Sequence, residues 1–238
     1  GWNNKGVRGI APKASIFGND YLNSTTVGAF NEAHGSNPTP GVTADIYNMS
    51  YGAAYPTDEN DAFLQNYNLP SFITSTREAV FINGVLNLRS NKGALYVWAA
   101  GNEYDVSSLS GACGTGEPLS CSEASIDNKN GLPWIIPVAA LDANGVKSSY
   151  STPGSSLWVS GFGGEYGYDG SVYSASGDEI EPAIMTVDRT SCSLGSSKTG
   201  TNSTAGKNKF DLAGQNFSEQ QTLNPNCNYL SSFNGTSS

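Results

Sequence analysis

The sequence is poor in charge, and above all in positive charge. Only 14% of its 238 residues are charged, and 12 Lys and Arg stand against 21 Asp and Glu, which gives a net charge of −9. So few cations argue against nucleic acids and anionic membranes as partners, because both are bound through Lys and Arg. No run approaches the ~18 consecutive apolar residues of a transmembrane helix, so we expect no membrane segment in this chain.

Cysteine and histidine are also scarce. The four cysteines form no Cys-x-x-Cys pair and His34 is the single histidine, so a structural zinc site is not expected. A weakly charged surface rich in Gly, Ser, Asn and Thr is frequent in exported proteins, which favours a secreted or extracytoplasmic location. Four cysteines allow three pairings. We favour Cys113–Cys121 and Cys192–Cys227 because each closes a local loop, with free buried thiols as the alternative.

The start of the sequence lacks both an initiator Met and a signal peptide. Gly1 opens directly on polar residues. A secretory leader has a basic start followed by an apolar region, and neither is present. We therefore expect a processed product or a fragment.

The run from Ala94 to Ala100 organises the rest of the chain. It is apolar and rich in β-forming residues, as expected of a parallel strand covered on both faces. Gly101 and Asn102 follow at its carboxyl end, where open α/β sheets carry their chemistry. Gly101 permits a sharp turn or a close approach, and the Asn102 amide is a neutral donor suited to an oxyanion. The alternative is an ordinary strand-ending turn.

Hydrophobic periodicity predicts further elements on both sides of this strand. Helices are expected over 25–33, capped by Thr25 or Thr26, and over 71–88. A turn followed by a strand is expected over 6–16, and further strands over 44–49, 134–141, 156–160 and 182–187. Residues 193–226 are polar and predict a long loop. The alternation favours right-handed βαβ crossovers. The predicted fold class is therefore α/β, a doubly wound, mostly parallel sheet with helices on both faces.

Five segments, read in order, resemble the subtilisin-like serine proteases. They are 6–15, Asn48-Met-Ser-Tyr-Gly52, Ala99-Ala-Gly-Asn102, 134–141 with 148–151, and Gly235-Thr-Ser237. The kexin and furin branch, with its bacterial exported members, is the most similar, on 93–102 and on 183–188 followed by Cys192. The resemblance implies a partial peptidase domain over 1–238, truncated at both ends, with 193–230 as an inserted polar loop.

The resemblance also implies roles for particular residues. Ser237 would attack the scissile carbonyl, while its own N–H and the Asn102 side chain would hold the oxyanion. Ser50, Tyr51 and Gly52 would bind a polypeptide substrate as an added strand, and Tyr51 would shape a subsite. Ala99, Ala100 and Gly101 would form one wall of the primary specificity pocket. The chemistry would require no cofactor.

The sequence departs from the family where the catalytic base should be. The family's Asp and His precede the segment matched by Gly6, and no Asp-Ser-Gly, Asp-Thr-Gly or His-Gly-Thr-His occurs here. A serine without a base is a weak nucleophile, so we expect an internal fragment that does not turn over by itself. His34 comes after the Gly6 segment and is followed by a Pro-Gly loop. It is therefore predicted to be a surface-loop histidine and not the base.

Acidic residues give a weaker signal for a metal. Asp58 and Asp127 match, in rough position, the residues that hold calcium in the furin branch, but a third acid expected near Thr152 is missing. Because calcium takes six or more oxygens, a structural Ca²⁺ site competes with a solvated acidic face. The same carboxylates would favour a basic residue before the scissile bond.

Two other functions remain as alternatives. The first is a non-catalytic protease homologue that acts as a peptide-binding module. The second is a nucleotide-binding doubly wound protein, which the lack of a Gly-x-Gly-x-x-Gly after any expected strand disfavours.

Overall fold

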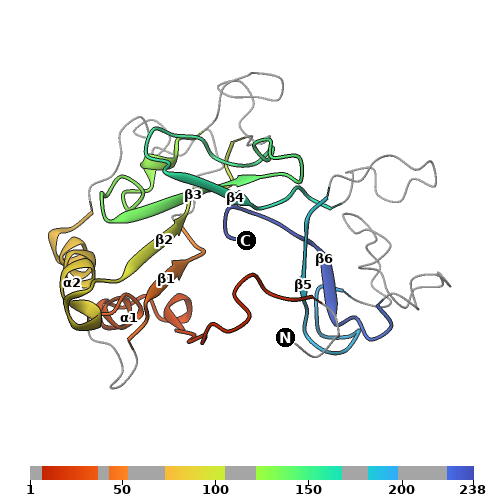
Figure 1. Ribbon diagram of the computed structural model, residues 1–238, viewed down its shortest axis with the longest axis horizontal. Helices are drawn as coiled ribbons and strands as arrows, with labels where there is room; N and C mark the ends of the chain where they lie inside the picture. Colours follow the sequence, from red (N-terminus) through yellow and green to blue (C-terminus); the bar gives the residue numbers. More distant parts are fainter. Residues whose placement is uncertain (1–6, 37–42, 53–72, 105–121, 168–181, 198–223) are drawn as a thin grey trace.

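The computed structural model describes residues 7–36, 43–52, 73–104, 122–167, 182–197 and 224–238. Within them, the chain forms a parallel sheet in the order β1-β2-β3-β4 and a separate antiparallel pair, β5-β6 (Figure 1). The parallel strands are β1 (Ile46–Met49), β2 (Leu95–Ala99), β3 (Ile135–Leu141) and β4 (Val159–Phe162). The α-helices are α1 (Val27–Ala33) and α2 (Ser75–Asn91), and short 3-10 turns lie at η1 (Tyr21–Asn23) and η3 (Ala124–Ile126). The antiparallel strands are β5 (Ile184–Val187) and β6 (Tyr229–Phe233).

The four-stranded sheet confirms the predicted parallel α/β fold. Strand β2 lies between β1 and β3 and pairs with both in parallel register, with Trp98 opposite Met49 and opposite Pro137. Tyr96 and Trp98 are almost completely buried. Because all four strands run in the same direction, their carboxyl ends lie along one edge of the sheet (Figure 1).

The helices follow the sequence signals closely. Helix α1 begins after Thr26, whose hydroxyl accepts a hydrogen bond from the Ala29 N–H at 3.2 Å, so the predicted capping is confirmed. Helix α2 covers most of the predicted 71–88 segment. Its last turn leaves helical geometry at Leu88, and Arg89 and Ser90 adopt positive φ angles of 56° and 57°.

The core between the helices and the sheet is aromatic, and His34 lies inside it. Phe30, Phe81, Tyr96 and Trp98 belong to this buried cluster. The expectation that His34 is a surface-loop residue is wrong, because its side chain has 0% exposure. The physical reason is that α1 continues to Ala33. His34 therefore caps the helix, and its ring is directed into the core instead of into the loop that follows.

Two other segments differ from the sequence prediction. No strand forms within 7–20, where Ile10 and Ile16 are exposed and a turn closes with Ala14 N–H on the Ala11 carbonyl. A strand needs a paired neighbour, and the described part of the chain places none beside this segment. Strand β6 was not predicted, and its first residues, 229 and 230, fall at the end of the stretch taken as an insertion.

The disulfide between Cys192 and Cys227 is confirmed. It joins residues that are 35 positions apart and lie next to the ends of β5 and β6, with a Cα–Cα distance of 4.9 Å. Cys113 and Cys121 lie outside the described residues. Among the helices of the described part, none is long and apolar enough to cross a membrane.

Candidate active site

The final turn of the chain is joined by hydrogen bonds to the carboxyl end of β2. The Thr236 N–H donates to Asn102 Oδ1 at 2.9 Å, and the Thr236 hydroxyl donates to the same oxygen at 3.1 Å. The Gly101 N–H in turn donates to Thr236 Oγ1 at 3.1 Å. Residues 101–102 and 235–237, which are more than 130 positions apart in the sequence, therefore form one continuous surface.

The end of β1 reaches the same place. The Ser50 hydroxyl donates to the Ser237 carbonyl at 2.8 Å and accepts from Asn48 Nδ2 at 3.0 Å. The segments 48–52, 99–102 and 235–237 that the resemblance singled out thus meet around Ser237, whose side chain is half-buried. Gly52 follows as an exposed residue.

The orientation of the Asn102 amide follows from these contacts. Because Oδ1 accepts both bonds from Thr236, the donor side of the amide, Nδ2, is directed elsewhere. A Cβ placed on Gly235 would lie 3.6 Å from Asn102 Nδ2 and 3.6 Å from the Ser237 nitrogen. The two donors expected at the oxyanion therefore lie at similar distances from one point beside Gly235, whose φ is 121°.

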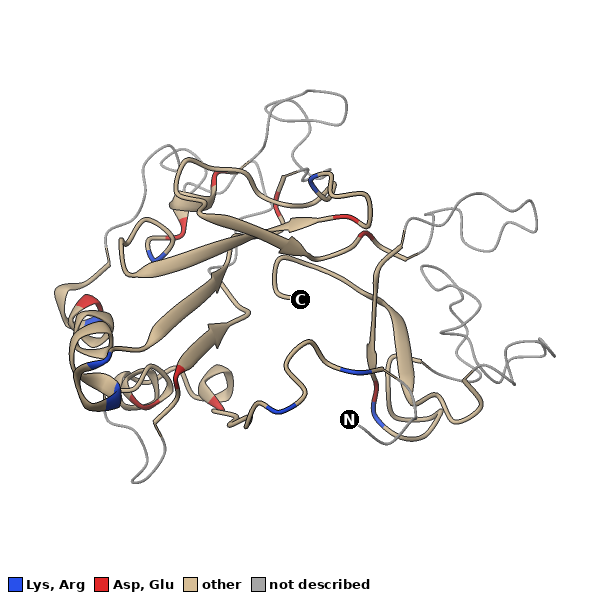
Figure 2. Cartoon of the chain, in the orientation of Figure 1, with Lys and Arg blue, Asp and Glu red and all other residues tan. Residues whose placement is uncertain are grey.

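The electrostatics of this edge come from neutral groups and the nearby carboxylate of Glu103. Strands β1 to β4 and residues 234–238 carry no Lys, Arg, Asp or Glu (Figure 2). Glu103 lies next to the turn, where its Oε2 accepts from the Asn102 N–H at 2.7 Å. Burial raises the pKa of Glu103, an effect that its hydrogen bonds to Asn102 and Thr152 partly oppose.

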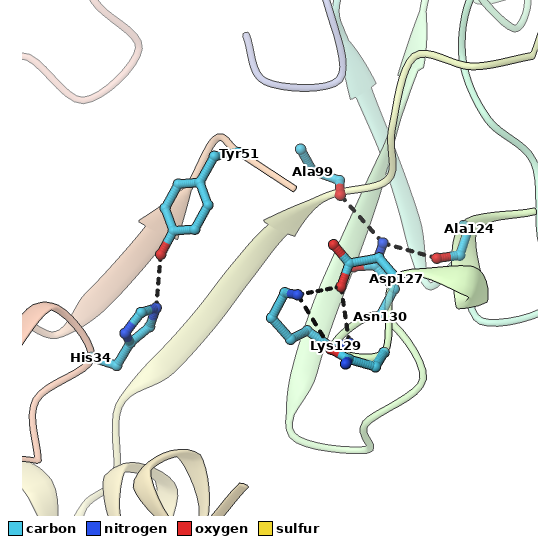
Figure 3. A network of polar contacts seen from close by, with 8 residues as sticks. His34, Tyr51, Ala99, Ala124, Asp127, Lys129 and Asn130 are labelled. Carbon is cyan, nitrogen blue, oxygen red and sulfur yellow. Dashed lines mark hydrogen bonds and ion pairs between the residues drawn. The ribbon is translucent and has the colours of Figure 1, made fainter. Parts of the chain in front are cut away.

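Backbone and side-chain contacts hold Ala99, Ala100 and Gly101 in place. Asn130 Nδ2 donates to the Ala99 carbonyl at 3.3 Å and to the Ala124 carbonyl at 3.1 Å (Figure 3). The Ala100 N–H donates to the Val138 carbonyl across the sheet. The Thr152 N–H donates to the Gly101 carbonyl at 3.1 Å. These three small residues are therefore held from both sides.

The carboxylate of Asp127 is already paired with a cation from the chain. Asp127 is 4% exposed, and Lys129 Nζ lies 2.6 Å from its Oδ1 (Figure 3). The described residues hold no group of three or more His, Cys, Asp or Glu side chains able to bind a metal. Within the described residues, Asp127 therefore stands in no such group. Asp58 lies outside the described residues, so calcium stays a prediction and no step is derived through it.

The single histidine is not part of this arrangement. Its Nδ1 lies 2.7 Å from the Phe30 carbonyl and its Nε2 lies 2.9 Å from the Tyr51 hydroxyl, below the sheet edge (Figure 3). Desolvation lowers the pKa of His34 to about 4, assisted by the charges of Lys129 and Arg77 and opposed by the Phe30 carbonyl. A fully buried imidazole with both nitrogens occupied has no access to the Ser237 hydroxyl.

Several residues at the site escaped the sequence analysis. Thr236 lies inside the Gly-Thr-Ser motif, so the sequence marks the residue but not its hydrogen bond to Asn102. Asn130 follows a 3-10 turn, with no motif to mark it. Thr152 was noted only because an acid was missing there, whereas its hydroxyl accepts from the Glu103 N–H at 2.9 Å. Such contacts depend on the tertiary fold and leave no local signal.

The fold and the three converging strand ends define a class that comparison with known proteins identifies. The model of the subtilase family, Peptidase_S8, matches residues 1–238. The chain therefore belongs to the subtilase family.

Its relatives include bacterial serine proteases, one of which is described as extracellular. It is 28% identical over 247 residues to the Aeromonas extracellular serine protease of Aeromonas sobria, covering 98% of this chain and 33% of that protein. It is 32% identical over 120 residues to the microbial serine proteinase of Aeromonas salmonicida, covering 50% of this chain and 16% of that protein. The chain thus spans about a third of the length of the first relative.

Solved structures agree with this assignment. The Aeromonas sobria serine protease in complex with its chaperone matches with a TM-score of 0.68 and 27% identity, over 96% of this chain and 34% of that one. A structure of the Aeromonas sobria protease matches with a TM-score of 0.56 and 28% identity, over 81% of this chain and 28% of that one.

Proposed function

We propose that these residues form part of an exported serine endopeptidase that hydrolyses peptide bonds through an acyl-enzyme. Ser237 is the nucleophile, and Asn102 Nδ2 with the Ser237 N–H stabilises the oxyanion. The observation that carries the proposal is the pair of hydrogen bonds from Thr236 to Asn102 Oδ1. They bring the two donors and the serine to one place and leave Nδ2 available to an incoming carbonyl oxygen.

The proposed substrate is a polypeptide in extended form. The segment Ser50–Gly52 continues from β1, and its first residue, Ser50, bonds to the Ser237 carbonyl, as expected of a substrate-binding edge. Ala99, Ala100 and Gly101 leave room for the side chain before the scissile bond because their own side chains are small. Export is supported by the disulfide and by a relative described as extracellular.

The buried state of His34 favours a second reading for the 238 residues taken alone. A serine hydroxyl needs a base to become a good nucleophile. The single histidine of this sequence has both ring nitrogens engaged elsewhere. Without the Asp and His of the family, these residues form a site that binds peptides without cleaving them.

Labelling with a fluorophosphonate separates the two functions. The complete gene product that contains this chain should be labelled at Ser237, and a Ser237→Ala variant should not. The 238 residues expressed alone should remain unlabelled, since the base is missing. A complete protein that is not labelled at Ser237 would refute the enzyme and leave the peptide-binding homologue.

A further inference from the structure

His34 connects three parts of the structure through its backbone and its ring. Its N–H donates to the Phe30 carbonyl at 3.1 Å, which ends α1. Its carbonyl accepts from the Tyr96 hydroxyl at 2.7 Å, which joins it to β2. Its imidazole meets Tyr51 in the segment after β1. No part of the proposed acyl transfer uses this residue.

The hydrogen bonds of the ring fix its tautomer. A carbonyl oxygen only accepts, so Nδ1, which lies 2.7 Å from the Phe30 carbonyl, must carry the proton. Nε2 is then the acceptor for the Tyr51 hydroxyl at 2.9 Å. Burial raises the pKa of Tyr51 well above its ordinary value, so this hydroxyl keeps the proton that it donates.

Aromatic packing holds the pair in place. The His34 ring is stacked parallel to Trp98 at 6.2 Å between ring centres and lies 4.1 Å from the centre of Phe30. Tyr51 packs edge-on against Trp98 at 5.0 Å. The Tyr51 side chain is therefore turned inward, away from solvent, and its hydroxyl points at His34 (Figure 3).

Residues 50 and 51 consequently face opposite ways. Tyr51 is anchored in the core by His34, while the preceding side chain, that of Ser50, bonds to the Ser237 carbonyl at 2.8 Å. Side chains alternate between the two sides of an extended segment. Holding the Tyr51 side chain in the core therefore also fixes the backbone of Ser50 on the opposite side. A substrate that pairs through its main chain depends on that backbone being in place before it binds.

We propose that His34 is a positioning residue for peptide binding, which holds Tyr51 and thereby sets the backbone of Ser50–Gly52 for an extended polypeptide. The inference rests on the proposed function, since it requires that this segment binds substrate. It assigns the buried histidine to recognition of the substrate main chain and not to proton transfer.

The test compares long and short substrates in the complete protein. His34→Leu removes the acceptor, and Tyr51→Phe removes the donor but keeps the ring. Each should raise the KM for an extended peptide about five- to tenfold and change kcat less than KM, because one hydrogen bond of ordinary strength is lost. For a short ester, which does not reach Ser50–Gly52, KM should rise much less.

Two further variants sharpen the test. The double variant should be no worse than His34→Leu, because both changes break the same bond. His34→Gln, whose amide can both donate and accept, should recover part of the lost affinity. Tyr47→Phe is the matched control, since this tyrosine of β1 stacks on Tyr96 instead of the His34 ring and its loss should leave KM unchanged.

The outcomes distinguish this inference from the proposed function. An unchanged KM for the extended peptide in Tyr51→Phe, additive losses in the double variant, or equal losses on ester and peptide would each refute the role of His34. If His34→Leu does not fold, Tyr51→Phe and Tyr47→Phe decide the question. A wild-type protein without fluorophosphonate label at Ser237 would instead refute the protease itself.

Discussion

At the scale of single residues, the proposed chemistry depends on which way one amide faces. Asn102 is exposed, yet its Oδ1 receives two hydrogen bonds from Thr236. Because the amide oxygen accepts from Thr236, the amide nitrogen is left for the proposed contact with the substrate. The Gly-Thr-Ser motif therefore has a second functional part besides the proposed nucleophile. Its threonine orients the amide expected to meet the oxyanion.

Substitutions at residue 102 separate the donor from the acceptor. Asn102→Asp keeps an oxygen for Thr236 but loses the Nδ2 donor, and Asn102→Ala loses both. Both should lower kcat by about 10²–10³-fold, a range taken from removal of the equivalent donor in subtilisin and not from this chain. Thr236→Val keeps the hydrogen bond from the Thr236 backbone N–H to Asn102 and should lower kcat less than tenfold. Steady-state kinetics of the complete protein give kcat for each variant. A near-normal kcat in Asn102→Asp would contradict the proposed donor.

Some site residues could be predicted from the sequence because they lie in contiguous motifs. Asn102 and Ser237 stand at the ends of apolar strands or in short Gly-containing motifs, which a reader of the sequence can recognise. Asn130 and His34 could not be assigned in this way. A lone asparagine and a histidine before a Pro-Gly loop look like surface residues until the fold brings partners to them.

At the scale of elements, strands with continuous apolar runs were predictable and the marginal ones were not. Strand β3 is apolar from Ile135 to Leu141 and lies where expected. Strand β6 carries two serines in five residues, so its local pattern is weak. It forms because β5 offers an antiparallel partner, as in the pairing of Val187 with Tyr229, and because the disulfide joins the neighbouring residues.

The contact between α2 and β2 predicts an unusual response to a helix-favouring change. Gly84 lies in α2, where glycine ordinarily costs about 0.5–1 kcal/mol relative to alanine. A Cβ at this position would overlap the Tyr96 hydroxyl, so Gly84→Ala should instead destabilise the protein by about 1–3 kcal/mol. Asn87→Ala, an exposed change in the same helix, should stay within about 0.5 kcal/mol of wild type.

Urea unfolding of the complete protein compares these two variants. The hydroxyl of Tyr96 also donates to the His34 carbonyl, so displacing it disturbs the aromatic core. If Gly84→Ala were more stable than wild type, the close packing of α2 on β2 would be refuted.

At the scale of the whole molecule, one aromatic cluster joins the elements that the site needs. Phe30 comes from α1, Phe81 from α2 and Trp98 from β2, and Tyr51 packs on it from the segment after β1. The sequence predicted the parallel sheet because strand order and apolar runs are local properties. It did not predict that the single histidine would lie at the centre of this cluster, since that depends on four separate segments meeting.

The burial of His34 predicts how stability depends on pH. Desolvation lowers its pKa from an ordinary value of 6.5 to about 4, with Lys129 and Arg77 adding to the effect. Between these values the unfolded chain binds a proton that the folded protein does not, so stability is complete above pH 6.5 and falls as pH drops toward 4. At 1.36 kcal/mol per pKa unit, the loss is about 3 kcal/mol. Glu103, which follows β2, has a raised pKa and changes stability with pH in the opposite direction.

A comparison with His34→Gln isolates the contribution of this one group. Denaturant unfolding of the complete protein, followed at several pH values from 7 to 4, gives the free energy of unfolding for both proteins. The variant lacks the titrating ring. Between pH 7 and pH 4 its free energy of unfolding should therefore fall by about 3 kcal/mol less than that of the wild type, whatever its stability at pH 7. Parallel curves for the two proteins would mean that His34 gains its proton as readily in the folded state as in the unfolded one. In that case the neutral ring that accepts from Tyr51 would not exist near pH 5.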